Sequence, residues 1–141
     1  MSVPEASLPR PPLRTAAELN RITGIIIGGS MAVHSCLGPG LLESVYQACL
    51  GHELRKRGVS FESNLQLPVC YDGVELDVGF RLDFLVEGEV IVELKAVERV
   101  HPIHQAQLYS YLRLRLSRLG LLINFNVVHL RDGITRVVNG L

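Results

Sequence analysis

The sequence predicts one domain that mixes helices and strands, either α/β or α+β with a mixed sheet. Two stretches with apolar residues at helical spacing come first, and a region in which apolar and polar residues alternate follows them. One more helical stretch interrupts the alternating region, which indicates a helix crossing between strands of one sheet. With 141 residues, 48% hydrophobic and 20% charged, the chain suits a single compact core and not a disordered protein.

The N-terminal region differs from the rest of the chain. Four of the seven prolines fall within the first twelve residues, so residues 1–14 are predicted to be a flexible arm and residues 15–141 the single domain. These prolines also interrupt the apolar segment that a secretory signal needs. The three cysteines form no C-x-x-C pair. Together these features predict a reduced, cytoplasmic protein.

Two helices are predicted before any strand. Thr15 can cap the first helix, and Glu18, three residues on, completes a capping box. The Gly38-Pro39-Gly40 segment ends that helix. The second helix is predicted for residues 41–56 and stops before Gly58, a residue that suits the position after a helix C-terminus.

After Gly58 the period of the apolar residues changes to two. Strands are predicted at residues 60–69, 74–86, 90–96, 119–125, 127–130 and 134–138, and a third helix at residues 103–116. Three turn signals separate strands that form hairpins, namely Tyr71-Asp72-Gly73, Glu87-Gly88-Glu89 and Arg131-Asp132-Gly133. The 74–86 strand is long enough to bend, and Gly79 marks the expected bulge.

The hairpin around the 87–89 turn can be aligned from its hydrophobic pattern. A three-residue turn places six apolar side chains on one face, and a two-residue turn mixes them with charged ones. A slip of one residue moves every side chain to the other face, so the first register is strongly preferred. The face consists of Leu82, Phe84, Val86, Val90, Val92 and Leu94.

The same register sets Asp83 directly opposite Glu93, with Lys95 two residues further on. Opposed like charges destabilise a sheet, so the pair needs an explanation. Two carboxylates whose Cβ atoms lie roughly 5 Å apart suit a divalent cation such as Mg²⁺ or Mn²⁺. A neighbouring lysine can hold an attacking water or stabilise charge on a phosphate. The alternative is a ladder of charged side chains on the solvent face of a hairpin.

The charge is balanced overall but not along the chain. Lys plus Arg and Asp plus Glu each number 14, which excludes a strongly basic nucleic-acid coat. Residues 21–98 carry six basic and eleven acidic side chains, and residues 99–141 carry six basic and one acidic. The basic group Arg113, Arg115 and Arg118 is either an edge that contacts phosphates or a solvated helix end.

Several spaced motifs resemble a known family. Residues 40–46 have the form G-x-x-E-x-x-Y and follow Leu37-Gly38-Pro39. With Asp83, Glu93-Leu94-Lys95, Gln107 and the apolar run 120–125, they resemble the bacterial GxxExxY protein family of the PD-(D/E)XK nuclease-like superfamily. The likeness extends from about Leu19 to Val138. It implies a restriction-endonuclease-like core of order α-βββ-α-β, here with an extra N-terminal helix and a C-terminal hairpin.

The resemblance also implies roles for individual residues. Asp83 and Glu93 bind Mg²⁺ or Mn²⁺ in such nucleases, and Lys95 acts on the water nucleophile. Glu43, on the preceding helix, is the candidate that completes the metal shell, and the backbone carbonyl of Leu94 is a further candidate ligand. The position that often holds proline in the superfamily signature is Leu82 in this chain.

A second motif of the resemblance lies on the predicted third helix. Gln107 and Tyr111 match the Q-x-x-x-Y pattern of exonuclease-like branches, and their i, i+4 spacing places both on one helix face. The resemblance assigns them to orienting the substrate or Lys95. Gln105 with Tyr109 has the same spacing, but Ala106-Gln107-Leu108 followed by Tyr111-Leu112 fits the pattern A-Q-L-x-x-Y-L better.

These observations lead to two hypotheses of different classes. The first is a Mg²⁺- or Mn²⁺-dependent nuclease-like phosphodiesterase that acts on DNA or RNA. The second is a non-catalytic interaction module that keeps the nuclease fold, can bind a metal and works through a homodimer or a partner protein. No membrane attachment is expected, because the apolar run Ile25–Ile27 is far shorter than the ~20 residues of a bilayer span.

Overall fold

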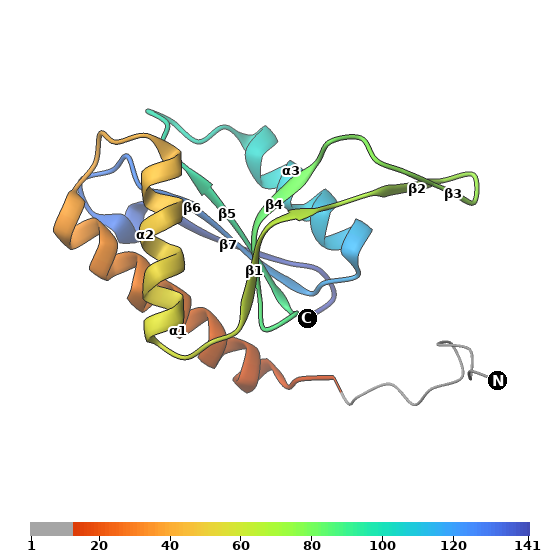
Figure 1. Ribbon diagram of the computed structural model, residues 1–141, viewed down its shortest axis with the longest axis horizontal. Helices are drawn as coiled ribbons and strands as arrows, with labels where there is room; N and C mark the ends of the chain where they lie inside the picture. The colour runs from red at the N-terminus through yellow and green to blue at the C-terminus, as the bar shows by residue number, and fades with distance from the viewer. Residues whose placement is uncertain (1–12) are drawn as a thin grey trace.

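A computed structural model describes residues 13–141 of the protein. Its centre is a five-stranded sheet in the order β1-β4-β5-β6-β7, from which a two-stranded ribbon, β2–β3, projects (Figure 1). The helices are α1 (Ala16–Leu37), α2 (Glu43–Lys56), α3 (Pro102–Arg115) and the short 3-10 helix η2 (Leu130–Gly133). The strands are β1 (Phe61–Gln66), β2 (Val69–Tyr71), β3 (Val74–Leu76), β4 (Arg81–Val86), β5 (Val90–Lys95), β6 (Leu119–Asn124) and β7 (Ile134–Val138).

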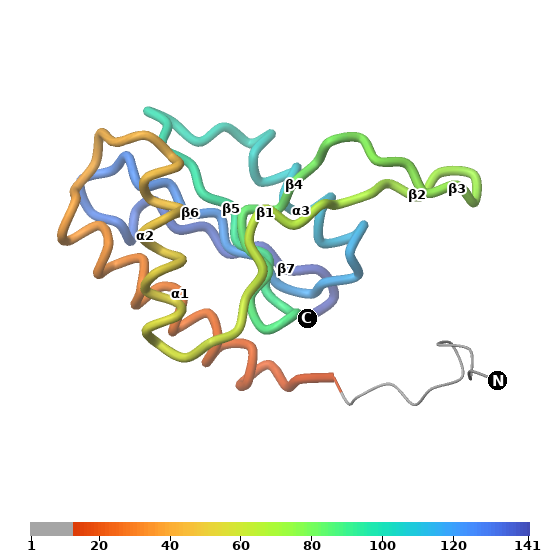
Figure 2. Tube along the Cα trace, in the orientation of Figure 1, coloured from red at the N-terminus to blue at the C-terminus, as the bar shows by residue number. Residues whose placement is uncertain are grey.

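The sheet lies between two layers of helices (Figures 1 and 2). Helices α1 and α2 cover one face, where Leu19, Tyr46 and Phe84 join one buried cluster. Helix α3 covers the other face, where Leu108 and Leu112 join a second cluster. It connects β5 to β6, which are parallel, as a crossover helix must. Both faces of β6 are therefore buried, which explains its continuous apolar run. No helix within residues 13–141 is long and apolar enough to cross a membrane.

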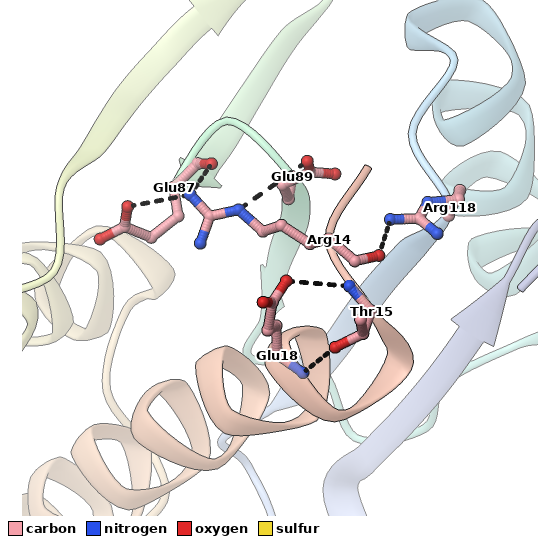
Figure 3. Close-up of polar contacts among 6 residues, drawn as sticks. All are labelled: Arg14, Thr15, Glu18, Glu87, Glu89 and Arg118. Carbon is pink, nitrogen blue, oxygen red and sulfur yellow. Dashed lines mark hydrogen bonds and ion pairs between the residues drawn. The ribbon is translucent and has the colours of Figure 1, made fainter. Parts of the chain in front are cut away.

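The start of α1 confirms the predicted capping box. The backbone N–H of Glu18 donates to Thr15 Oγ1 at 3.1 Å, and the backbone N–H of Thr15 donates to the Glu18 carboxylate at 2.9 Å (Figure 3). The glycines that weaken this helix intrinsically permit close packing against α2. A Cβ atom on Gly29 would lie 3.3 Å from the Cβ of Glu53, so the two helices meet tightly there.

Residues 1–12 of the predicted arm lie outside the described residues, but Arg14 is described and is not free. Its guanidinium lies 3.5 Å from the Glu87 carboxylate and 3.9 Å from that of Glu89. Its carbonyl oxygen accepts a hydrogen bond of 2.7 Å from Arg118 (Figure 3). The acidic β4–β5 turn and Arg118 thus contact Arg14, and the division into an arm of residues 1–14 and a domain of residues 15–141 stays a prediction.

Two of the predicted strands are divided in the structure. The predicted 60–69 strand ends at Gln66, and its last residue, Val69, begins β2. The predicted 74–86 strand is interrupted by residues 77–80. There the Asp77 carboxylate accepts a hydrogen bond from the N–H of Gly79, whose φ is +80°. This Asx-type turn ends β3, so a single bent strand was the wrong prediction.

The predicted strand at residues 127–130 is absent, and η2 occupies residues 130–133 instead. The Val127 carbonyl lies 2.7 Å from His34 Nε2 of α1, so it is not available to a strand ladder. Gly133 lies against the backbone of Asn124 so closely that a Cβ atom would overlap the Asn124 carbonyl. The C-terminal hairpin is consequently formed by β6 and β7, with η2 in its connection.

Candidate functional site

The β4–β5 hairpin has the register predicted from its hydrophobic pattern, with Phe84 opposite Val92 and Val86 opposite Val90. Beyond Phe84 the backbone pairing stops, and acidic side chains replace the missing carbonyls. The Asp83 N–H donates to the Glu93 carboxylate at 3.2 Å, and the Leu94 N–H donates to the Asp83 carboxylate at 2.7 Å. Each acid thus satisfies a backbone donor of the opposite strand, and this exchange brings the two carboxylates together.

The strand alternation changes at this same point. Leu82 belongs to the cluster under α3, whereas Phe84 belongs to the cluster under α1 and α2. The prediction that both share one face is therefore wrong. The β1–β4 register passes from the Ser63–Phe84 pair to the Leu65–Leu82 pair and skips Asn64, which has a φ of +52°. At this step the side-chain alternation of both β1 and β4 is shifted by one residue, at the point where β4 separates from β5.

Glu93 is buried and Asp83 half-buried, and both lie where their charged forms are disfavoured. Glu93 is 9% exposed, and burial together with the charge of Asp83 raises its pKa to about 8. Burial also raises the pKa of Asp83, although its hydrogen bond from Leu94 opposes this change. Lys95 favours the charged form of both carboxylates. Ionising both adjacent acids is therefore unfavourable even beside Lys95, and a bound cation would favour the charged form of the pair.

Glu43 lies at the first position of α2, within electrostatic reach of this pair. Its pKa is raised by burial and then by the charge of Asp83, and Lys95 counteracts the rise. Among residues 13–141, however, no three His, Cys, Asp or Glu side chains lie close enough to form a metal cluster. The structure therefore joins Asp83 and Glu93 closely and holds Glu43 nearby, outside direct contact with them.

Tyr46 holds the loop that leads to Glu43. Its hydroxyl donates to the Gly38 carbonyl at 2.7 Å and accepts from the Leu41 N–H at 3.1 Å. The ring is fully buried. The Glu and the Tyr of the G-x-x-E-x-x-Y pattern therefore have different tasks in the structure: the Tyr fixes the loop, and the Glu approaches the acids.

Two further polar residues near the site were missed by sequence reasoning. Gln47 Nε2 donates to Asn64 Oδ1 at 3.0 Å and to the Asp83 carbonyl at 3.4 Å, bridging α2 to both strands. Asn124, 2% exposed, accepts from the Val97 N–H at 3.1 Å and donates to the Val97 carbonyl at 2.9 Å. A polar residue ending the apolar run of β6 was the signal for Asn124. Gln47, one helical turn after Glu43, gave a weaker signal.

The two α3 candidates differ in their relation to the acids. Tyr111 is half-buried, and burial followed by the charges of Glu93 and Asp83 raises its pKa. Its ring lies 5.7 Å from that of Phe80, measured between centroids. Gln107 is exposed on the same helix, and among residues 13–141 no hydrogen bond links it to either acid. The structure therefore brings Tyr111, and not Gln107, into the electrostatic environment of the pair.

A groove of about 410 Å³ lies beside the acids, between α2 and β1. One wall is a stripe of small and polar side chains on α2, including Ser44, Gln47 and Gly51. Arg55 supplies the one charge among its lining residues, and its guanidinium lies 5.2 Å from the centre of the Phe61 ring. Gln47 and Asn64 line the groove, and Gln47 also donates to the Asp83 carbonyl, so the groove adjoins the acidic pair.

The donor set of the pair fits a hard divalent cation. Both groups are carboxylates, and Mg²⁺ is commonly bound through one or two carboxylates while it keeps several waters. A third protein carboxylate in direct contact is not required for such a site. The raised pKa of Glu93 shows that a second negative charge beside Asp83 is unfavourable, and a bound cation would stabilise that charge.

A mixed sheet between helical layers, with two opposed acids where adjacent strands part, defines a nuclease-like α/β domain. Residues 20–137 match the family described as the PD-(D/E)XK nuclease superfamily. Since that match covers most of the chain, the protein belongs to the PD-(D/E)XK nuclease superfamily. Neither the curated proteins nor the solved structures contain a match to this chain. The narrower resemblance to the GxxExxY proteins stays a prediction.

Proposed function

We propose that this protein is a nuclease that hydrolyses phosphodiester bonds of DNA or RNA with Mg²⁺ or Mn²⁺. The observation that carries the proposal is the pair of hydrogen bonds by which Glu93 accepts from the Asp83 N–H and Asp83 accepts from the Leu94 N–H, because they hold the two carboxylates close together near Lys95. An arrangement that only stabilised the hairpin would not need two acidic side chains whose negative charges repel each other. Membership of the nuclease superfamily supports the same chemistry.

In this proposal Asp83 and Glu93 hold the cation, with the Leu94 carbonyl as a further ligand. When bound, the cation supplies Lewis-acid activation of a phosphate oxygen and of a nucleophilic water. Glu43 lies further away and orients the waters around the site by hydrogen bonds. Its position depends on the loop that Tyr46 holds.

Lys95 has the role of a positioned cation in the chemical step. Its ammonium group donates a hydrogen bond to the attacking water or to a phosphate oxygen, and it stabilises the negative charge that develops there. Tyr111 and Gln107 orient the substrate or the lysine from α3. The half-buried Tyr111 hydroxyl is protonated at neutral pH and can donate a hydrogen bond, and the nearby acids raise its pKa further.

The groove between α2 and β1 is the proposed path of one nucleic-acid strand next to the acids. Arg55 contacts a phosphate, and the Phe61 ring offers an apolar surface beside it. Ser44 and Gln47, which line the groove, supply hydrogen bonds that do not distinguish between nucleobases. A chain with no net charge binds a duplex weakly, so tight binding requires a second copy or a partner protein.

The alternative proposal is a non-catalytic module that keeps the nuclease fold. The balanced charge of the chain favours it, because nucleic-acid enzymes rely on basic surfaces for much of their affinity. In that case Asp83 and Glu93 still bind a cation, but no bond is broken, and the protein acts through its contacts with another chain.

Cleavage assays distinguish the two proposals. Labelled single- and double-stranded DNA and RNA are incubated with the full chain and Mg²⁺ or Mn²⁺, with EDTA as the metal-free control. The nuclease proposal expects metal-dependent cleavage that Lys95→Ala lowers by roughly a hundredfold or more and that exposed Lys56→Ala leaves intact. Cleavage that survives in Lys95→Ala would show that the assigned roles are wrong. Metal binding without cleavage of any substrate supports the module.

A further inference from the structure

The β2–β3 ribbon has one face made only of apolar side chains. Val69 pairs with Leu76 and Tyr71 with Val74, and residues at alternate positions of a strand share a face. All four therefore lie on one side of the ribbon, and the Cys70–Glu75 pair lies on the other. Tyr71 is 73%, Val74 55% and Leu76 42% exposed, so most of this face is open to solvent in the described chain. A two-stranded hairpin is marginally stable unless its apolar face is covered.

The charge of this region argues against nucleic acid as the partner that buries the apolar face of the ribbon. Residues 58–80 contain four acidic side chains and no basic one. Of the acids on the ribbon, Asp72 lies in its turn and Glu75 on its polar face, and both are exposed. A phosphate backbone would be repelled by such a projection, since proteins that bind it neutralise phosphates with Lys and Arg. The surface that covers the ribbon must be apolar with a basic rim.

The C-terminal end of α3 has that composition. Residues 99–131 contain five basic side chains and no acidic one. Leu114 is 42% and Leu116 85% exposed there, beside the exposed Arg113 and Arg115. Leu116 caps the helix with a φ of +58°, a left-handed conformation in which glycine is the usual residue. A strained and almost fully exposed leucine has no role in the isolated chain, but it suits an anchor in an interface.

The two surfaces lie on the same side of the molecule. In Figures 1 and 2 the β2–β3 ribbon projects to the right, and the C-terminal end of α3 also lies in the right-hand half. A two-fold axis on this side places the ribbon of each chain against α3 of the other chain. A single two-fold rotation therefore forms two equivalent contacts between a ribbon and α3. The reciprocal arrangement doubles the buried area, and the opposite charges of the two surfaces attract.

We propose that the protein forms a homodimer in which the apolar face of each β2–β3 ribbon docks on the Leu114–Leu116 end of α3 in the second copy. The acidic Asp72, in the turn of the ribbon, faces the basic rim that includes Arg113 and Arg115, and Glu75 lies on the face turned away from the contact. This contact leaves the Asp83–Glu93 pair outside the interface. The dimer does not depend on nuclease activity, so it stands or falls separately from the proposed function.

The test is the mass of the full chain in solution, measured by sedimentation velocity and light scattering over a range of concentrations. We expect a dimer whose dissociation constant rises with salt, because screening weakens the charged rim. Leu116→Gly should raise the dissociation constant by roughly tenfold or more, as loss of a buried anchor does. The same change should keep or raise the melting temperature, because glycine suits the left-handed cap. A wild-type protein that stays monomeric at all concentrations overturns the proposal.

Further variants define which surfaces meet. Tyr71→Ser should weaken the dimer as Leu116→Gly does, and Val128→Ser should not, although Val128 is 79% exposed. Reversing the charge in the ribbon turn (Asp72→Lys) should weaken association, and so should Arg113→Glu with Arg115→Glu, whereas Glu75→Lys on the far face should not. Combining Asp72→Lys with the two arginine changes should restore association. A dimer that none of these variants affects contradicts the proposed interface. Variants that lower nucleic-acid binding but not self-association also contradict it.

Discussion

Tyr46 lies flat against Phe125, with ring centroids 4.5 Å apart and ring planes inclined by 11°. Phe125 follows β6, and its N–H donates to the carbonyl of Lys95 at 2.9 Å. Tyr46 itself holds the loop before Glu43 through its hydroxyl. One stacked pair therefore connects the helix that carries Glu43 with the strand end that carries Lys95. This contact gives the tyrosine of the G-x-x-E-x-x-Y pattern a positioning role.

We predict that Tyr46→Phe keeps the stacking but loosens the loop. The change leaves the half-buried Gly38 carbonyl and the Leu41 N–H without this partner, which costs about 0.5–1.5 kcal/mol of stability. Urea denaturation measures this loss, and calorimetry with Mn²⁺ should show weaker binding because Glu43 is less well held. Tyr109→Phe, on an exposed tyrosine, should change neither quantity. Equal metal affinity in Tyr46→Phe and wild type would refute the positioning role.

A second prediction concerns the pH dependence of stability without metal. The pKa of Glu93 is about 8 in the folded protein, above its ordinary value of 4.5. The folded state therefore holds this proton more tightly than the unfolded chain does. The stability so gained is complete below pH ~4.5 and is lost as the pH rises through ~8. The raised pKa of Asp83 acts in the same direction.

Glu93→Gln should flatten this profile, because glutamine keeps the shape of the side chain and does not titrate. Between about pH 5 and pH 9 we expect the wild type to lose on the order of a few kcal/mol relative to the variant. Chemical denaturation at several pH values measures the difference, with the exposed Glu98→Gln as the matched control. A wild-type profile that coincides with that of Glu93→Gln would contradict the buried charge.

A third prediction concerns the segment after Lys95. Asn124 bonds the N–H and carbonyl of Val97 and accepts from the Asn126 N–H at 3.2 Å. Asn124→Ala leaves these groups unpaired in a buried place and should cost about 2–4 kcal/mol. Urea denaturation measures the loss. Asn20→Ala removes an exposed contact with Arg136 and should cost under about 0.5 kcal/mol. Similar losses in both variants would show that Asn124 does not hold the segment.

A fourth prediction tests the groove between α2 and β1. In a Lys95→Ala background, Arg55→Ala should weaken binding of single-stranded nucleic acid and reduce the salt slope by about one phosphate contact. Fluorescence anisotropy at several salt concentrations provides both values. Lys56→Ala removes an equal charge from the next residue, which does not line the groove, and should have a smaller effect. Equal effects of the two variants would indicate general charge and not a groove.

The sequence predicted the parts of the fold that local rules determine. The capping box at Thr15 and the register of the β4–β5 hairpin were both confirmed, because one depends on hydrogen bonds within four residues and the other on a short turn with strict alternation. The face of Leu82 was predicted wrongly, because the left-handed Asn64 on a different strand changes the alternation. No periodicity within β4 contains that information.

The meeting of Asp83 and Glu93 followed from the register, but the network around them did not. Tyr46 and Asn124 act through contacts with residues 79 and 27 positions away, at Phe125 and Val97. Such contacts are visible only once the helices are placed on the sheet. The strand predicted at 127–130 failed for the same reason, since His34 of α1 takes up the Val127 carbonyl.

Calorimetric titration of the full chain with Mn²⁺ tests the central claim most directly. If the buried carboxylates of Asp83 and Glu93 hold a cation, the wild type binds Mn²⁺, Asp83→Asn binds it roughly tenfold or more weakly, and Asp72→Asn binds it like the wild type. A wild type without measurable binding, or an Asp83→Asn variant that binds equally well, would contradict the account.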